Sequence, residues 1–324
     1  MKSVLIYAII SFGVALAITP FVIKALLRLR ARQEILKYVE WHKVKSGTPT
    51  MGGVIFILPL LILAGFFLNK DTPLANIAVL AAVGYGLLGF LDDYIKIRGG
   101  KNQGLRAYQK FIGQGGIAIL VGVFYFLANR DGRILIPFSN ETWDIGLWIL
   151  PLTVFVLVAT TNSVNLTDGV DGLAGSVSLL YFVFIGFLIM FVSRFVPMDE
   201  AGTFMIIAAV MCGALVCYLL FNSNKAKVFM GDTGSLFLGG LIATISMFSF
   251  LGLFILILGA VFVLSAVSVM IQVAYFKATK GKRVFLMTPF HHHLEKKNWA
   301  EARIVFLYCA ITAIAGTVCI VTLV

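Results

Sequence analysis

The sequence predicts an all-α fold: a polytopic integral membrane protein with about ten transmembrane helices and both termini outside the cytoplasm. Hydrophobic residues make up 60% of the 324-residue chain and charged residues only 13%, whereas soluble domains carry about 25% charged residues. The apolar residues form long blocks, and the basic residues fall between those blocks. Long uninterrupted blocks indicate membrane spans and disfavour a large soluble helical protein, whose helices would show amphipathic spacing.

Ten apolar runs of roughly 15 to 24 residues are long enough to cross about 30 Å of hydrocarbon, the shorter ones marginally. They cover residues 4–27, 52–68, 75–91, 110–128, 145–160, 174–192, 202–221, 236–251, 253–276 and 302–323. The boundary between the eighth and ninth runs rests on Leu251, Gly252 and Leu253. No soluble domain fits between the runs, so residues 1–324 are expected to form a single integral membrane domain.

Alternate loops between these runs differ in their basic residues. One set holds 19 Lys and Arg residues and consists of 28–50, 96–110, 161–173, 222–235 and 277–300. The opposite set holds only Lys70, Arg130, Arg133 and Arg194. Because loops rich in Lys and Arg stay in the cytoplasm, the five loops of the basic set should be cytoplasmic. The net charge of +11 then reflects contact with an anionic membrane surface and does not indicate nucleic-acid binding.

The first cytoplasmic loop ends in Lys45-Ser-Gly-Thr-Pro-Thr50-Met-Gly-Gly53, directly before the second run. A lysine, hydroxyl groups and glycines suit contact with a phosphate or a sugar. Glycine and proline also mark ordinary turns, so a flexible turn before a span is an equally good interpretation of this segment alone.

Asp92 and Asp93 follow the third run, and Lys96 comes one helical turn later. Adjacent carboxylates repel each other and need a nearby cation or a raised pKa on one of them. Carboxylate oxygens at a membrane surface suit Mg²⁺, which takes one or two carboxylates together with substrate phosphates. The alternative is a salt bridge at the end of a span.

The third cytoplasmic loop contains Asn162, Asn165, Asp168 and Asp171, with Gly169 and Val170 between the last two and Gly172 after them. In a helix, the polar residues at this three-residue spacing would share a face. The two glycines predict instead that the helix breaks, and broken backbone at membrane depth is tolerated where it lines a cavity. The alternative is a polar loop that caps the next helix.

Two further polar segments belong to cytoplasmic loops. Phe229-Met-Gly-Asp232-Thr-Gly-Ser235 offers an aspartate for a metal and a helix N-terminus for a phosphate, or a simple N-cap. Pro289-Phe-His291-His292-His293-Leu-Glu295 offers phosphate donors, a proton shuttle or metal ligands. The absence of an HExxH motif disfavours a zinc hydrolase.

Acids, amides, lysines and histidines thus gather at the predicted cytoplasmic face, while the spans are nearly free of charge. That arrangement suits phosphoryl transfer with Mg²⁺ between a soluble anionic substrate and a lipid. A membrane transporter is the alternative from another class. It would place ionisable residues near the bilayer midplane and often shows a repeated half, and neither feature is found.

These motifs resemble those of the polyprenyl-phosphate N-acetylhexosamine-1-phosphate transferases over nearly the whole chain. The Asp-Asp pair, the Asn-x-x-Asn-x-x-Asp-Gly-x-Asp-Gly row and Gly-Asp-Thr-Gly-Ser are shared widely in that superfamily. Thr48-Pro-Thr-Met-Gly-Gly53 and Pro289-Phe-His-His-His-Leu-Glu295 resemble its phospho-N-acetylmuramoyl-pentapeptide transferase branch rather than its N-acetylglucosamine-phosphate branch, which is the runner-up.

The resemblance implies an Mg²⁺-dependent enzyme of peptidoglycan synthesis in the bacterial cytoplasmic membrane. Its substrates would be UDP-MurNAc-pentapeptide and undecaprenyl phosphate, and its products lipid I and UMP. Either the lipid phosphate attacks directly or an aspartate first forms a phospho-enzyme. Direct attack is favoured because the nucleophile is already an anion. The sequence permits a homodimer without indicating one.

The resemblance also implies roles for individual residues. Catalytic roles fall to Asp92, Asp93, Asp232 and His291, with Asp232 as the Mg²⁺ ligand and Asp93 deprotonating or orienting the lipid phosphate. Lys96 and Lys110 would hold phosphates. The uridine pocket would comprise Lys45, Gly169, Val170, Asp171 and Phe229, with Phe229 stacked on the base. Further substrate-binding residues would be Thr50, Asn162, Asn165 and Asp168 along the nucleotide-sugar site and Gln272, His291, His292 and His293 toward the sugar.

Overall fold

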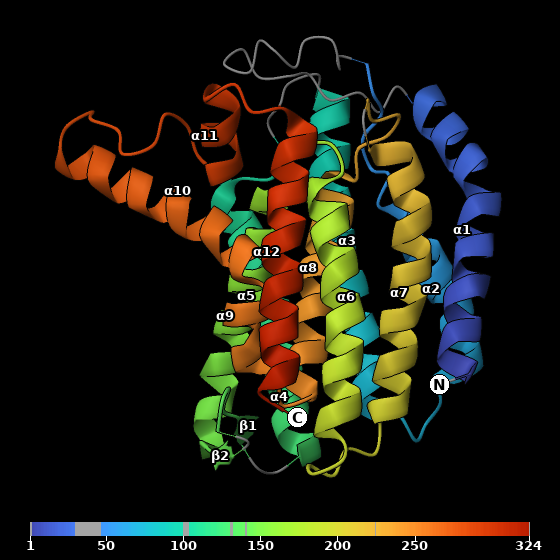
Figure 1. Ribbon diagram of the computed structural model, residues 1–324. Helices are drawn as coiled ribbons and strands as arrows, with labels where there is room; N and C mark the ends of the chain where they lie inside the picture. Colours follow the sequence, from blue (N-terminus) through green and yellow to red (C-terminus); the bar gives the residue numbers. More distant parts are fainter. Residues whose placement is uncertain are drawn as a thin grey trace.

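The computed structural model describes residues 2–29, 47–99, 104–129, 132–139, 141–223 and 225–323. Long helices run side by side in a bundle, and a small β-hairpin closes one end (Figure 1). The α-helices are α1 (Lys2–Arg28), α2 (Val54–Phe67), α3 (Pro73–Gly99), α4 (Ala107–Asn129), α5 (Ile149–Thr167), α6 (Leu173–Val192), α7 (Ala201–Asn222), α8 (Gly231–Phe248), α9 (Ile255–Leu258), α10 (Ala260–Ala278), α11 (Phe290–Lys296) and α12 (Glu301–Val321).

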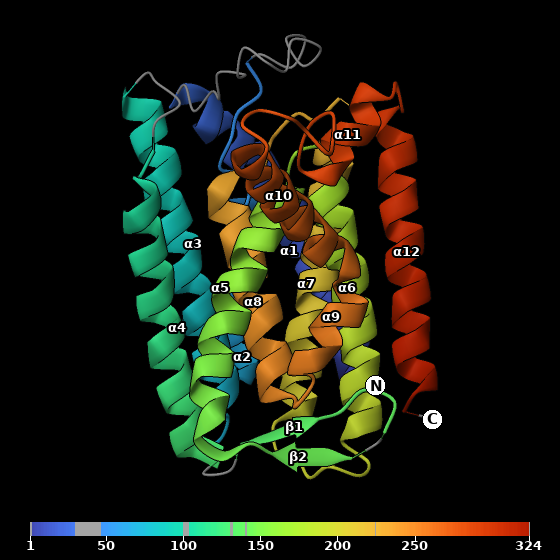
Figure 2. The same cartoon turned by 90° about the vertical axis from the view of Figure 1, so that its left-hand side faces the viewer.

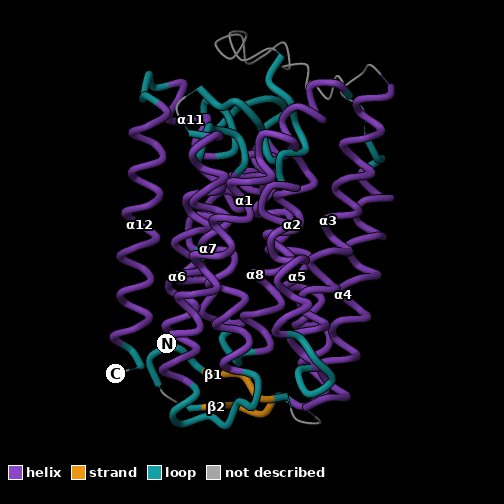
Figure 3. Tube along the Cα trace, turned by 90° about the vertical axis from the view of Figure 1, so that its right-hand side faces the viewer, coloured by secondary structure: helices purple, strands orange, loops and turns teal. Residues whose placement is uncertain are grey.

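The predicted membrane-spanning architecture is confirmed in this part of the chain. Nine of the described helices are long and apolar enough to cross a membrane, and α2 is a shorter apolar helix of 14 residues. Both termini lie at the same end of the bundle (Figures 1 and 3). The loops predicted to be cytoplasmic lie at the opposite end, insofar as they are described.

The ninth predicted run is not one straight helix. It begins with the 3₁₀ turn η3 (Gly252–Phe254), continues as α9, and turns at Gly259 into α10. From there α10 leans out of the bundle (Figure 1). Its outward side chains are apolar, with Met270 68% and Val273 47% exposed, as expected for a helix that faces lipid.

The hairpin was not predicted from the sequence. Strand β1 (Arg133–Leu135) pairs antiparallel with β2 (Thr142–Asp144). Asp144 Oδ1 accepts the backbone N–H groups of Gly132, at 3.0 Å, and Gly146, at 2.8 Å. The Leu135 N–H donates to the Phe250 carbonyl at 3.0 Å. The hairpin is thereby fastened to the turn after α8, at the end of the bundle that holds the termini.

Helix α8 forms the centre of the bundle. It packs against α3, α5, α6 and α2 (Figure 2). Of its apolar 18-residue stretch, 89% is buried. Glycines permit this close packing. A Cβ at Gly89 of α3 would collide with the Asp232 backbone carbonyl, and one at Gly239 of α8 would lie 2.5 Å from Thr161 Cα of α5. Small residues at such contacts let membrane helices approach closely, and here they place the first turn of α8 between α3 and α5.

Candidate active site

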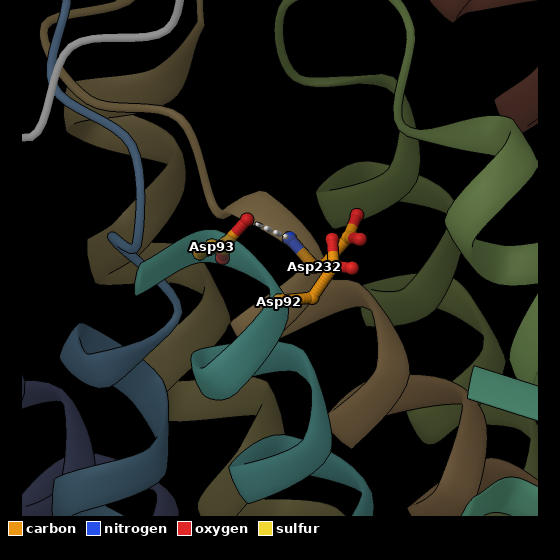
Figure 4. Close-up of side chains that lie close together, drawn as sticks. All are labelled: Asp92, Asp93 and Asp232. Atoms are coloured by element: carbon orange, nitrogen blue, oxygen red, sulfur yellow. Dashed lines mark hydrogen bonds between the residues drawn. The ribbon is translucent and has the colours of Figure 1, made fainter. Parts of the chain in front are cut away.

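Three aspartates meet where α3 passes the start of α8. Asp92 and Asp93 lie on α3, and Asp232 lies in the first turn of α8 (Figure 4). Each offers a carboxylate oxygen, and these oxygens all lie within 4.8 Å of one another. Asp92 and Asp93 are buried, each only 3% exposed. A buried group of three carboxylates is a candidate metal site, because carboxylate oxygens are the ligands that hard divalent cations take.

Two lysines and an amide hold Asp232 in place. Lys96 Nζ and Lys110 Nζ donate to Asp232 Oδ2 at 3.0 and 2.6 Å. Asn165 Nδ2 donates to Asp232 Oδ1 at 2.7 Å and to Ser235 Oγ at 2.8 Å. Lys96 also forms an ion pair with Asp92. We call Asp92, Asp93, Lys96, Lys110, Asn165 and Asp232 the Asp232 cluster; all six were predicted as site residues from the sequence.

Asp93 caps the N-terminus of α8. Its Oδ1 accepts the Asp232 N–H at 3.2 Å, and its Oδ2 accepts the Thr233 N–H at 2.9 Å and the Thr233 hydroxyl at 2.7 Å. A carboxylate at this position satisfies otherwise unpaired N–H groups and favours the helix dipole. These two donors are therefore already paired, which favours the N-cap over the phosphate site among the two interpretations of this helix end.

The helices reach further toward the site than the apolar runs suggested. Helix α3 continues past the run that stops at residue 91, so Asp92, Asp93 and Lys96 share one continuous helix. Helix α8 begins at Gly231 instead of residue 236. The polar motifs are helix ends within the bundle, and this rigid backbone fixes the spacing of their side chains.

The loop between α5 and α6 brings Asp168 close to the cluster. Helix α5 ends at Thr167, and Gly172 adopts a left-handed φ of 76° just before α6, so the predicted break is confirmed. Asp171 Oδ2 accepts the Ala226 N–H at 3.0 Å. Burial, together with the negative charges of Asp232, Asp93 and Asp171, raises the pKa of Asp168 to about 8.

Gly169 joins this loop to the histidine motif. A Cβ at Gly169 would collide with His291 Nε2 and lie 3.1 Å from His292 Nε2. His291 is fully buried, and its ring meets that of His292 edge-on at 4.3 Å between centroids. His292 Nδ1 is paired with Glu295. The α5–α6 loop and the histidine motif, more than a hundred residues apart in sequence, are thus packed against each other.

The glycine-rich segment before α2 pairs with the loop before α8. The Phe229 N–H donates to the Pro49 carbonyl at 2.8 Å, and the Gly52 N–H donates to the Phe229 carbonyl at 2.7 Å. A Cβ at Gly231, whose φ is 69°, would lie 2.6 Å from Thr50 Oγ1 and 2.5 Å from Asp93 Oδ2. Thr50 therefore lies beside the capped end of α8. Lys45 lies outside the described residues.

Four predicted substrate-binding residues make other contacts. Gln272 Oε1 accepts the Val284 and Phe285 N–H groups at 3.0 and 2.9 Å. His293 Nδ1 accepts the Leu286 N–H at 3.1 Å. Both side chains shape the loop between α10 and α11.

Asn162 Nδ2 donates to Gln114 Oε1 at 2.7 Å and to the Val158 carbonyl at 2.8 Å. Val170 is buried just before α6. The side chains of this second pair therefore also pack against protein.

Sequence reasoning missed two buried amides that organise these segments. Asn222 Oδ1 accepts the Gly172 N–H at 2.9 Å, and Asn222 Nδ2 donates to the Val228 carbonyl at 2.8 Å. It thereby ties the loop before α6 to the loop before α8. Gln114 pairs with Asn162. The available signal was an amide within or at the end of an apolar run, where an unpaired polar group is costly.

Comparisons with known proteins show the family of the chain. The model of glycosyl transferase family 4 matches residues 75–250, and the phospho-N-acetylmuramoyl-pentapeptide-transferase signature 1 matches residues 45–57. The chain is 42% identical over 316 residues to the phospho-N-acetylmuramoyl-pentapeptide-transferase of Clostridium kluyveri, covering 96% of each chain. It is also 42% identical over 327 residues to the enzyme of that name from Listeria monocytogenes serotype 4b, covering 98% of this chain and 99% of the relative.

Proposed function

Because the chain belongs to the phospho-N-acetylmuramoyl-pentapeptide transferases of glycosyl transferase family 4, we propose that it transfers a phospho-sugar at the Asp232 cluster. The donor is UDP-MurNAc-pentapeptide and the acceptor is undecaprenyl phosphate. The products are lipid I and UMP. This is a membrane step of peptidoglycan synthesis, in keeping with a multi-pass protein of the bacterial cytoplasmic membrane. A homodimer stays a prediction.

The observation that carries this proposal is the convergence of two lysines and three carboxylates at one end of the bundle. Lys96 and Lys110 both reach Asp232 Oδ2. In the reaction their ammonium groups bind the phosphates of donor and acceptor, whose negative charges would otherwise repel each other. A transporter would have no need to gather these groups at a helix end.

The cluster also fits a magnesium ion. Its three carboxylates lie within 4.8 Å of one another, and two lysine charges leave them one negative charge in excess. We propose Asp232 as the protein ligand, with its carboxylate oriented by Asn165. A bound Mg²⁺ would neutralise the phosphate charge that develops during transfer.

The chemistry is a single displacement at phosphorus. A phosphate oxygen of undecaprenyl phosphate attacks the β-phosphorus of the donor, a new P–O bond forms, and the bond to the α-phosphate oxygen breaks as UMP leaves. The attacking oxygen is already an anion, so no prior aspartyl-phosphate is required. Asp93 is proposed to deprotonate or orient the lipid phosphate, with Asp92 as the alternative. Both oxygens of Asp93 accept hydrogen bonds from α8, and Asp92 likewise accepts the Leu105 N–H at 2.8 Å and pairs with Lys96.

The remaining residues are proposed to recognise the donor. Gly169, Val170, Asp171 and Phe229, together with Lys45, would form the uridine pocket. Thr50 and Asp168 would line the path of the diphosphate, and His291 and His292 would contact the sugar. Support comes from the contact between Gly169 and His291 and from the pairing of Phe229 with the segment around Pro49.

The test is reconstitution of the purified protein with undecaprenyl phosphate, Mg²⁺ and UDP-MurNAc-pentapeptide, with UDP-GlcNAc in a parallel reaction. UMP release is followed over time, and Asp232→Asn is the control variant. We expect UMP from the muramoyl donor alone, and its loss with EDTA and in the variant. UMP from UDP-GlcNAc instead would overturn the donor assignment. No UMP from either donor, in a folded sample, would overturn the transferase assignment.

A further inference from the structure

Two side-chain amides, buried Gln114 and half-buried Asn162, link α4 to α5 beneath the Asp232 cluster. Gln114 of α4 is only 1% exposed. Asn162 Nδ2 donates to Gln114 Oε1 at 2.7 Å, and Gln114 Nε2 lies 3.5 Å from Asn162 Oδ1. Two side-chain amides that face each other in this way bridge two membrane helices, where few polar partners are available.

The Asn162 amide has no donor left for a substrate in this arrangement. An amide nitrogen carries two hydrogens. One is directed to Gln114 Oε1, and the other to the Val158 carbonyl at 2.8 Å. Asn162 was predicted to bind substrate from its place in the Asn-x-x-Asn row, and its contacts point to a different task.

The register of the pair relates it to Asp232. Gln114 follows Lys110 by four residues on α4, and Asn162 precedes Asn165 by three residues on α5, so each lies about one helical turn from its neighbour. Lys110 holds Asp232 Oδ2, and Asn165 holds Asp232 Oδ1. The amide pair therefore joins α4 to α5 one helical turn away from two donors that hold the two oxygens of one carboxylate.

A third helix is fastened to the same point. The Tyr85 hydroxyl of α3 donates to the Gln114 main-chain carbonyl at 3.1 Å. The Tyr85 ring is fully buried, and a Cβ at Gly240 of α8 would lie 2.5 Å from its Cδ2. Gln114 thus joins α4 to α5 through its side chain and to α3 through its backbone carbonyl. Tyr85 in turn packs tightly against α8.

We propose that Gln114 and Asn162 are a positioning pair that sets the spacing of Lys110 and Asn165 and so fixes the orientation of the Asp232 carboxylate. The pair acts through these two residues and does not touch substrate. The inference rests on the proposed function for its kinetic consequence. Its effect on metal binding is independent of which substrate the enzyme uses.

The test compares Gln114→Met, Asn162→Leu, the double variant and the exchange Gln114→Asn/Asn162→Gln, which keeps both amides and their combined length. Thr153→Val is the matched control, because Thr153 is buried on α5 but its hydroxyl bonds to Ile149 of its own helix. Measurements are kcat and KM for UMP release, the Mn²⁺ affinity of the purified protein by electron paramagnetic resonance, and the thermal midpoint.

Each single variant should lower kcat by about 10- to 100-fold, as expected for a misplacement of up to 1 Å at a reacting centre, while KM for the nucleotide donor changes less than about 2-fold. Mn²⁺ affinity should fall in parallel. The double variant should be no worse than the poorer single variant, because both remove one interaction. The exchange should recover most of the activity and the Mn²⁺ affinity, and Thr153→Val should behave as wild type.

Three results would overturn the proposal. One is a raised KM with unchanged kcat in Asn162→Leu, which would mean direct substrate contact. The second is additive losses in the double variant. The third is unchanged Mn²⁺ affinity in every variant. If wild type releases no UMP from either donor, the proposed function fails, but the Mn²⁺ measurement still decides the role of the pair. If a single variant does not fold, the exchange variant is decisive: loss of Mn²⁺ affinity there, at an unchanged thermal midpoint, refutes the pairing.

Discussion

Replacing Gly169 by alanine tests the contact between the α5–α6 loop and the histidine motif. The added methyl group would collide with His291 Nε2 and press on His292. The backbone of Gly169 is not left-handed, unlike that of Gly172, so alanine brings no backbone strain. Any effect therefore reports the side-chain contact.

The magnitude follows from how little His291 can move. Its ring is fully buried and lies against His292, and it would have to shift by about 1 Å to restore an ordinary contact. A shift of that size near a reacting centre can cost about 100-fold in rate, and overpacking costs about 1–3 kcal/mol of stability. We expect kcat for UMP release to fall by about 100-fold while the protein still folds.

The assay is UMP release by Gly169→Ala in two backgrounds. Gly116→Ala serves as the matched control, since its Cβ would meet nothing within 4 Å. In a His291→Ala background, Gly169→Ala should add less than about a 2-fold loss, because the two changes act on one contact. Wild-type activity in the single variant, or losses that multiply in the double variant, would refute the reasoning.

Three further predictions concern the ends of helices. Asp93→Ala removes the acceptor of two N–H groups at the start of α8 and should cost about 1–2 kcal/mol of stability, measured by thermal denaturation against Asp71→Ala as an exposed control; an unchanged midpoint would contradict the capping role. Glu200 accepts the N–H groups of Leu74, at 3.0 Å, and Ala75, at 2.7 Å, at the far end of α3 from the site. Glu200→Ala should therefore lower the thermal midpoint while KM stays within about 2-fold, and a large rise in KM would count against this purely structural role. The pKa of Asp168 is raised to about 8, so the folded protein binds more protons than the unfolded chain between about pH 4 and 8. In EDTA its stability should thus decrease as pH rises through that interval, and Asp168→Asn should flatten the dependence; an equally steep decrease in the variant would refute the assignment to Asp168.

The long apolar runs were sufficient to predict the spans, because a lipid-facing helix needs an unbroken apolar stretch and little else. The grouping of Asp92, Asp93, Lys96 and Asp232 was also predictable. Charged groups at span ends on one side of the membrane avoid the hydrocarbon, so they are expected to pair with one another.

Helix ends were less predictable than spans. An apolar run ends at the first acidic residue. The helix itself can continue where a neighbouring side chain neutralises the acidic group, as Lys96 does for Asp92. Gln114, Asn222 and Glu200 escaped notice for a related reason. Each is a polar residue with a partner distant in sequence, and the neighbouring residues do not reveal which partner it contacts.

The burial of α8 has a consequence for how the protein tolerates its membrane. Lipid contacts mainly the outer helices. Only 17% of the apolar stretch of α1 and 28% of that of α12 is buried inside the protein, whereas 89% of the apolar stretch of α8 is buried. Hydrophobic mismatch with a thinner or thicker bilayer is taken up by tilting of lipid-facing helices. Asp232 lies on a helix that is surrounded by protein. When the acyl chains change in length, the outer helices should therefore tilt while the carboxylates of the Asp232 cluster keep their positions. In a bacterium that changes its lipids with temperature, the geometry of this site would stay the same.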